Sequence, residues 1–208
     1  MHATLSPSWK KSLLLVFVSV VAFVTATPAT SGPQCFFQGL GFLPGGNSSF
    51  ANGVNANGRV VVGSSNYAGG PVNQAFRWTA ARGMVGLGFL PGGDFSVANG
   101  VNANGKVVVG SARDASGAFQ AFRWTRATRM QSVVTLLLAA KVVTMDFGWQ
   151  LTGANGVSAD GTVIVGDGVA PLGLPQGWIA RLPKESNEDC EEDDDNQGDN
   201  DNQKDFGQ

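Results

Sequence analysis

Short stretches of alternating apolar and polar residues, separated by turn residues, run through the middle of the chain. At 74–79 the alternation places Phe76 and Trp78 on one face of a strand. Two further strand-like runs flank Asn57-Gly58, a dipeptide that favours a type I′ turn because both central residues of that turn need positive φ. With a fourth run at 84–90, the pattern predicts units of four short strands.

The same pattern recurs along the sequence. The segment at 39–79 returns at 86–125, with an offset of 47 residues from Gly41 to Gly88, and a weaker third copy spans 154–181. A fixed period of this length is typical of repeat proteins. Glycines interrupt the first strand of all three copies and indicate a β-bulge or a close approach of two backbones. They are Gly53, Gly100 and Gly156.

The repeats predict an all-β domain at 36–183, built from units at about 36–79, 80–125 and 149–183. The third unit stops after its third strand, and the segment 36–43 precedes the first unit. We therefore expect this N-terminal strand to complete the third sheet and cover its edge. The three sheets would then form a propeller-like ring or a triangular prism. A partial propeller completed by another copy and an open stack of sheets are the alternatives.

One stretch departs from the repeat. Residues 130–143 are rich in Leu, Val and Ala and contain no Gly or Pro, and Leu136, Leu137 and Ala140 share a helical face. This predicts one helical insertion at about 131–141, between the second and third units. Because the run is short and rich in β-branched residues, we expect it to pack over the sheets rather than dock a partner.

The two ends of the chain differ in character from the repeats. Residues 1–26 have the features of a secretory signal peptide, because Lys10 and Lys11 precede an apolar run at 13–24 and small residues follow it. A helix of that length rises about 18 Å, less than a bilayer's hydrocarbon core, so we expect cleavage and no membrane span afterwards. The polar, acidic tail at 184–208 is expected to be disordered. The protein is thus predicted to be secreted, to the periplasm or the extracellular space.

Charge divides between the body and the tail. Charged residues make up 14% of the chain and 29 residues are Gly, a composition that favours β structure with tight turns. Within 35–183 there are ten basic and five acidic residues, whereas 184–208 holds two Lys and eleven acidic residues. A basic body and an acidic tail predict self-association into a homo-oligomer as one mode of action, and a merely solvating tail as the other.

Two cysteines, Cys35 and Cys190, flank the repeats. In an oxidising compartment such a pair favours a disulfide that joins the two ends of the fold. Two free thiols are the alternative, because a bridge also requires a Cα separation that sequence does not supply.

Residue types exclude most catalytic chemistry. The only histidine is His2, in the predicted leader, which removes Ser-His-Asp catalysis and His-ligated zinc. No Glu precedes Glu185, and one of the five Asp residues of the body, Asp160, takes the place of the turn residues Asn57 and Asn104. A glycosidase needs two facing carboxyl groups. We therefore expect no enzyme, no metal and no cofactor, with an enzyme acting on extracellular polysaccharide as the minor alternative. The basic residues are scattered, so nucleic acid is not an expected partner.

Binding remains as a function, and loops are its expected place. The loops at 66–73 and 113–119 differ between the first two copies while the flanking strands match, and binding residues concentrate on loops. The recurring aromatics, such as Phe76 and Trp78, are expected in the core. We therefore expect a binding or scaffold module for an extracellular polysaccharide or an envelope protein. The candidate ligand-binding residues are Asn66, Tyr67, Asn73, Arg113, Asp114 and Phe119.

Three short motifs carry a family resemblance. They lie at 40–46 (Leu-Gly-Phe-Leu-Pro-Gly-Gly), 52–55 and 75–79, and each has a counterpart in the second copy. Together they resemble the HAF family of probable extracellular repeats, over nearly all of the body. That family takes its name from a His-Ala-Phe tripeptide, but Gln74 and Gln120 stand in place of its histidine here. The resemblance implies a secreted bacterial protein and brings no established activity and no catalytic residue.

Overall fold

The computed structural model describes residues 35–68, 72–142 and 148–184. The predicted leader at 1–26 and the acidic tail from Glu185 onward lie outside these residues. No helix in the described part of the chain is long and apolar enough to cross a membrane. The chain divides into two compact units, Met1–Gln38 and Gly39–Gln208, and the architecture below is that of the second unit.

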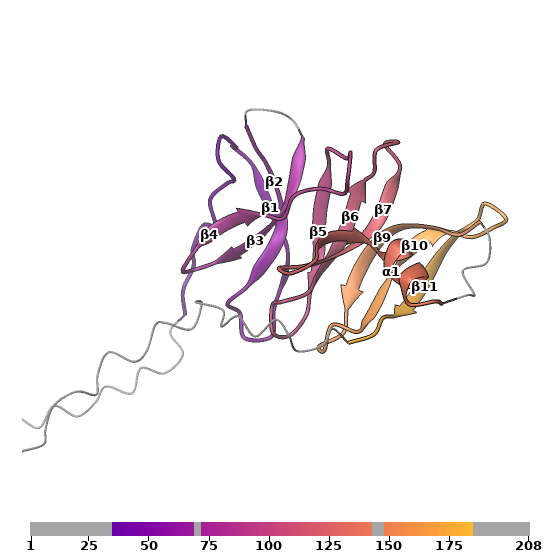
Figure 1. The fold of residues 1–208 in the computed structure, drawn as a ribbon. Helices are drawn as coiled ribbons and strands as arrows, with labels where there is room; N and C mark the ends of the chain where they lie inside the picture. Colours follow the sequence, from indigo (N-terminus) through magenta and orange to yellow (C-terminus); the bar gives the residue numbers. More distant parts are fainter. Residues whose placement is uncertain (1–34, 69–71, 143–147, 185–208) are drawn as a thin grey trace, which may run out of the picture. The chain divides into compact units, whose positions relative to one another are not determined.

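Eleven strands and one short helix follow one another along the described chain (Figure 1). The strands form three antiparallel sheets, in which each strand pairs with its neighbours in sequence. The first sheet comprises β1 (Ser49–Val54), β2 (Val61–Asn66), β3 (Asn73–Thr79) and β4 (Gly83–Gly86). The second comprises β5 (Ser96–Val101), β6 (Val108–Arg113), β7 (Phe119–Thr125) and β8 (Arg129–Ser132). The third comprises β9 (Gln150–Val157), β10 (Val163–Val169) and β11 (Pro175–Arg181).

The sheets pack one on the next in chain order. Strand β5 lies against β1, β2 and β3, and β9 lies against β5, β6 and β7 (Figure 1). The prediction of an all-β fold is confirmed. Among the described residues, however, the sheets close into no barrel and no propeller.

The expected closure by an N-terminal strand is wrong. Residues 35–42 adopt no strand, and the third sheet holds only its own three strands. Residues 39–43 instead lie on the first sheet, where Leu43 is buried with Phe76 and Trp78 and Leu40 packs against them. Two hydrogen bonds hold this segment there: the Leu43 N–H donates to Ser65 Oγ at 3.1 Å, and the Ser49 hydroxyl donates to the Gly41 carbonyl at 2.8 Å. Covering its own sheet buries these apolar side chains without a long crossing to the third sheet.

Four of the six recurring aromatics form the core, as predicted, whereas Phe42 is 52% exposed and Phe89 is only partly buried. Phe76 and Trp78 in the first sheet and Phe122 and Trp124 in the second are all buried. Phe76 and Trp78 pack with Leu43 on the other face of the first sheet. Phe122 and Trp124 lie between the first two sheets with Leu87 and Leu90 from the segment that links β4 to β5. That linking segment therefore acts as a filler between two sheets.

Glycines allow the first strands of successive sheets to approach closely. The strand register shifts beside Gly53 and beside Gly100, which confirms the predicted bulges. A Cβ on Gly53 would lie 3.1 Å from the Asn99 carbonyl oxygen, and one on Gly100 would lie 3.4 Å from the Gly156 Cα. These three glycines form a column that runs through the sheets.

The hairpin turns differ in type from the prediction. Gly58 has a φ of 75° and donates its N–H to the Asn55 carbonyl at 3.0 Å, but Asn57 does not have positive φ, so the turn is not type I′. Asn57 acts through its side chain, because its Oδ1 accepts the Arg59 N–H at 3.0 Å. Such local side-chain bonds stabilise turns without a left-handed backbone at the Asn itself.

The inserted helix is confirmed, with narrower bounds than 131–141. Helix α1 spans Val133–Ala139, and Ser132 caps it by accepting the Thr135 N–H at 3.1 Å. Gln131 belongs to β8 instead, where it pairs with Arg123. Two residues of the helix, Val133 and Leu137, are buried among apolar side chains of the second and third sheets. The helix thus fills this second interface, as residues 87–90 fill the first.

Candidate functional site

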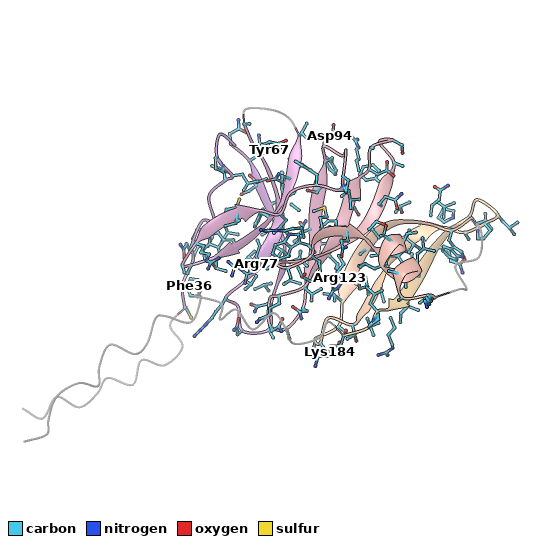
Figure 2. The ribbon with its side chains drawn as sticks, viewed as in Figure 1. Phe36, Tyr67, Arg77, Asp94, Arg123 and Lys184 are labelled. Carbon is cyan, nitrogen blue, oxygen red and sulfur yellow. The ribbon has the colours of Figure 1, made fainter. Side chains whose placement is uncertain are left out.

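The candidate binding residues sit at equivalent ends of two hairpins. Asn66 and Asn73 are the last register pair between β2 and β3, and Arg113 and Phe119 are the corresponding pair between β6 and β7. The variable loops therefore extend from the same end of their respective sheets. Figure 2 shows Tyr67 and Asp94, which flank this region, both at the upper end of the view.

Aromatic and cationic side chains meet on the β6–β7 hairpin. The Arg113 guanidinium carbon lies 5.2 Å from the ring centroids of both Phe95 and Phe119. The two rings meet edge to face, with centroids 5.7 Å apart. Cation–π and edge-to-face contacts of this kind restrict the side chains to one arrangement. Because Phe119 is still 43% exposed, the group presents an ordered aromatic surface to solvent.

Asp114 holds the loop of this hairpin together. Its Oδ1 accepts the N–H of Ser116 at 2.8 Å, the hydroxyl of Ser116 at 2.6 Å and the N–H of Ala118 at 3.1 Å. Its Oδ2 accepts the Gln120 side-chain amide at 3.0 Å. Hydrogen bonds from the side chains of Ser116 and Gln120 lower the pKa of this carboxyl below its ordinary value of 3.8. The carboxylate stays ionised at neutral pH and orders the loop behind Phe119.

The β2–β3 hairpin is arranged differently. The Asn66 Oδ1 accepts the N–H groups of Asn47 and Ser48, both at 2.9 Å, and its amide donates to Asn47 Oδ1 at 2.7 Å. Asn66 thereby fixes the turn that precedes β1. Tyr67 contacts Phe89, with ring centroids 5.8 Å apart. Part of this loop, residues 69–71, lies outside the described residues.

Sequence reasoning missed Phe95, which contacts Arg113, and it assigned Phe89 to the core, whereas Phe89 is partly buried and contacts Tyr67. Both come from the segment that links β4 to β5. Phe95 takes the place of Ser48 in the first copy. The two loops were identified because their sequences differ between the copies. The same comparison at position 95 identifies Phe95.

Two of the described carboxylates, Asp114 and Asp160, order turns, and Asp167 accepts the Asn155 amide within the third sheet. Asp160 Oδ1 accepts the Thr162 N–H at 3.1 Å, which confirms its predicted role as the turn counterpart of Asn57 and Asn104. Across residues 35–68, 72–142 and 148–184, no group of three His, Cys, Asp or Glu side chains is placed to hold a metal ion. The β6–β7 hairpin offers the Phe119 ring for stacking and the Arg113 guanidinium for charge-assisted hydrogen bonds.

The turn at Asp160 gives the fold a defined acid response. Hydrogen bonds from the Ser158 hydroxyl, the Thr162 N–H and the Thr162 hydroxyl lower the pKa of Asp160 from 3.8 to about 2. A carboxyl whose pKa is depressed on folding adds stability above its unfolded pKa, and this stability is lost as pH falls through the folded pKa. Relative to Asp160→Asn, the native protein should therefore be more stable at neutral pH and lose that advantage between about pH 4 and pH 2.

Urea midpoints of both proteins across this pH range measure the effect. Asp94→Asn removes a charge from an exposed loop and is the matched control. A difference between native protein and Asp160→Asn that stays constant with pH would contradict the assignment.

The predicted disulfide falls partly outside the described residues. Cys35 is exposed. Cys190 lies in the tail that the structure does not describe, so the pairing stays a prediction.

Comparison with known proteins adds no assignment to this geometry. Neither a scan against protein-family models nor a search of curated proteins finds a match to the chain. The resemblance to HAF repeats thus stays a prediction, and function is argued from the hairpins and the sheets.

Proposed function

We propose that this chain is a secreted β-repeat binding module, acting outside the cell or at the cell envelope, which recognises an extracellular polysaccharide without catalysing a reaction. The observation that carries the proposal is the group formed by Arg113 and Phe119 of the β6–β7 hairpin with Phe95 of the segment before β5. The leader pattern at 1–26 and the resemblance to HAF repeats support secretion. An envelope protein is the other partner that such a surface fits.

The chemistry of the hairpin suits a sugar chain. An aromatic ring offers a flat apolar face with a partial negative charge, which suits contact with the C–H groups on one face of a pyranose. A guanidinium donates planar, paired hydrogen bonds to carboxylates, so Arg113 favours a polysaccharide that bears uronic acids. Because Arg113 and Phe119 are already ordered by their mutual contact, little side-chain entropy is lost when a ligand binds.

Retention on immobilised polysaccharides tests this function. Phe119→Ala removes the exposed ring and should weaken retention on an acidic polysaccharide about tenfold, as loss of a central aromatic contact does elsewhere. Arg113→Gln should weaken it on acidic polymers more than on neutral ones, because it removes the charge and keeps a polar side chain. Leu172→Ala, at an exposed site on the tip of the β10–β11 hairpin, is the matched control and should leave retention unchanged.

Two outcomes count against the proposal. Failure of the native protein to bind any of a broad panel of extracellular polysaccharides would remove the carbohydrate function. Binding that both Phe119→Ala and Arg113→Gln leave intact would remove the hairpin as its site.

A structural, self-associating module is the second candidate function. The sequence motivates it by the basic body and the acidic tail, and it predicts association that weakens with salt and disappears when residues 184–208 are deleted. An additional observation favours self-association, because the outermost sheets expose apolar residues such as Phe50 and Ile179. A closed propeller also stays a proposal, because the ring would need additional sheets supplied by further copies of the chain.

A further inference from the structure

The packing of one sheet on the next provides a template for a contact between chains. We call the face of a sheet that meets the following sheet its back face, and the opposite face its front face. Val62 on the first back face and Val109 on the second are fully buried. The residue at the same register position of the third sheet is Val165, and it is 43% exposed. The third back face is therefore built like the two covered ones but lies open.

Hydrogen bonds between the sheets repeat as well. The Asn52 amide donates to the Ala98 carbonyl of the second sheet at 2.9 Å, and the Asn99 amide donates to the Ala154 carbonyl of the third at 2.9 Å. Asn155 holds the same position in the third sheet. Its amide donates to Asp167 Oδ2 within its own sheet. The side chain that would reach a following sheet is present and turned back onto its neighbour.

The column of glycines ends at the same place. Gly53 lies against the second sheet and Gly100 against the third. A Cβ on Gly156 would meet only the side chain of Val165, which is in its own sheet. A further glycine-bearing strand has room to approach here as closely as β5 and β9 approach theirs.

The first front face has the matching features. Ala51 is exposed, whereas its counterparts Ala98 and Ala154 are fully buried under the preceding sheets. The filler segment is also in place, because Leu43 packs on the first sheet as Leu90 packs between the first and second.

A hydroxyl on this front face repeats a bond from inside the stack. Ser96 Oγ donates to the Gly88 carbonyl at 2.7 Å and accepts the Ala75 N–H of the preceding sheet at 2.9 Å. Ser49 Oγ makes the equivalent donation to the Gly41 carbonyl. In a continued stack, its acceptor site would face the N–H of Gly177, the counterpart of Ala75.

We propose that the back face of the third sheet binds the front face of the first sheet of a second copy, so that the stack of sheets continues from chain to chain. This inference rests on self-association, the second candidate function, but attributes it to the sheet faces instead of to the basic body and the acidic tail, and it does not require the hairpin ligand. The contact is heterologous, since different faces meet, and it therefore propagates head to tail unless the ring closes. Apolar sheet contact rather than charge drives it.

Two residues of the third sheet differ from their counterparts in the covered sheets and determine the strength of the contact between chains. Ile179 stands where the first sheet has Arg77, whose Nε reaches across to the Gly105 carbonyl at 3.1 Å. Ile179 is 74% exposed, which makes this back face more apolar than its counterpart. Asp167 stands where the covered sheets have Ser64 and Ser111, so a carboxylate must lose water when the contact forms. The association is therefore concentration-dependent rather than permanent.

Sedimentation of protein purified after expression of the full chain tests the contact. The native protein should form oligomers as its concentration rises, and raising the salt to about 1 M should change the association constant by less than about twofold. Val165→Asp on the back face and Ala51→Asp on the front face should each weaken association about tenfold or more, because each would bury a charge. Both residues are exposed, and unchanged urea midpoints would show that both variants fold.

Mixing the two variants identifies the head-to-tail arrangement. Each variant retains one intact face, so an equal mixture should give a one-to-one dimer and nothing larger. A symmetric contact, in which the same face meets itself, would not produce this result and would overturn the proposal.

Asp167→Ser provides a test in the opposite direction. It restores the residue type of the covered sheets and releases the Asn155 amide, so association should strengthen about fivefold or more. Asp94→Ser removes the same charge from an exposed loop and should have no comparable effect. A native protein that stays monomeric at all accessible concentrations would overturn the proposal, and so would association that salt abolishes. Loss of polysaccharide binding with stacking intact would instead affect only the hairpin function.

Discussion

Gly110→Ala is expected to destabilise the fold by about 3 kcal/mol, as overpacking of a closed core position does. A Cβ at this position would lie 2.0 Å from the Val97 carbonyl oxygen and 2.9 Å from both the Ala98 Cα and the Phe122 ring. Two of these three atoms belong to backbone, which cannot turn aside as a flexible side chain can. The bulge at Gly100 draws β5 over this point of β6, and only glycine leaves room for it.

Urea unfolding followed by tryptophan fluorescence measures this loss. Gly177→Ala is the matched control, because it also lies in a strand and its Cβ would have the Gly166 carbonyl oxygen at 3.8 Å as its nearest neighbour. That substitution should be neutral or slightly stabilising, by about 0.5 kcal/mol, since alanine restricts the unfolded chain. Equal losses at the two positions would show that crowding by β5 is not the cause.

Phe122→Ala is expected to cost about 3–5 kcal/mol, the range found when a buried aromatic is removed from a core. Phe122 is fully buried between the first two sheets, where it packs in one cluster with Val62 and Leu90. The substitution leaves a cavity at the contact of two sheets, and strand pairing keeps either sheet from collapsing into it. The melting temperature should fall accordingly, with both sheets affected together.

Phe119→Ala supplies the comparison within the same strand. Phe119 is 43% exposed and contacts Arg113 and Phe95 at the hairpin end, so its loss should cost less than about 1 kcal/mol. The pair separates two roles of aromatic residues on β7, one in the core and one at the candidate binding surface. A larger loss for Phe119→Ala than for Phe122→Ala would reverse this assignment.

The sequence predicted the elements that depend on local pattern. Alternation over two residues set the faces of β3, so Phe76 and Trp78 were assigned to the core correctly. Gly100 marked a bulge because a glycine inside a strand weakens the strand and is typical of a bulge or a close backbone approach. The destination of residues 36–43 could not be found in this way. An open edge on the third sheet and an uncovered face on the first both suit an apolar segment, and packing decides between them.

In the candidate site, too, the sequence predicts what depends on local pattern and does not predict contacts between distant segments. The loops at 66–73 and 113–119 were identified because the copies differ there, but the contacts of Arg113 with Phe95 and Phe119 join segments from separate parts of the fold. Such contacts depend on where the segment from β4 to β5 passes, which no local pattern encodes. The sequence predicts Asp114 as a ligand candidate, whereas in the structure its side chain orders its own loop.

Two different connecting segments fill the two interfaces between sheets, and this bears on how the number of repeats can increase in evolution. Residues 87–90 fill one interface and helix α1 fills the other, yet β5 and β9 meet their preceding sheets in the same way. Each sheet completes its own strand pairing before it meets the next. Gene duplication can therefore lengthen the array by one sheet at a time. Only the connecting segment has to change, because any apolar segment of suitable bulk can fill the interface between two sheets.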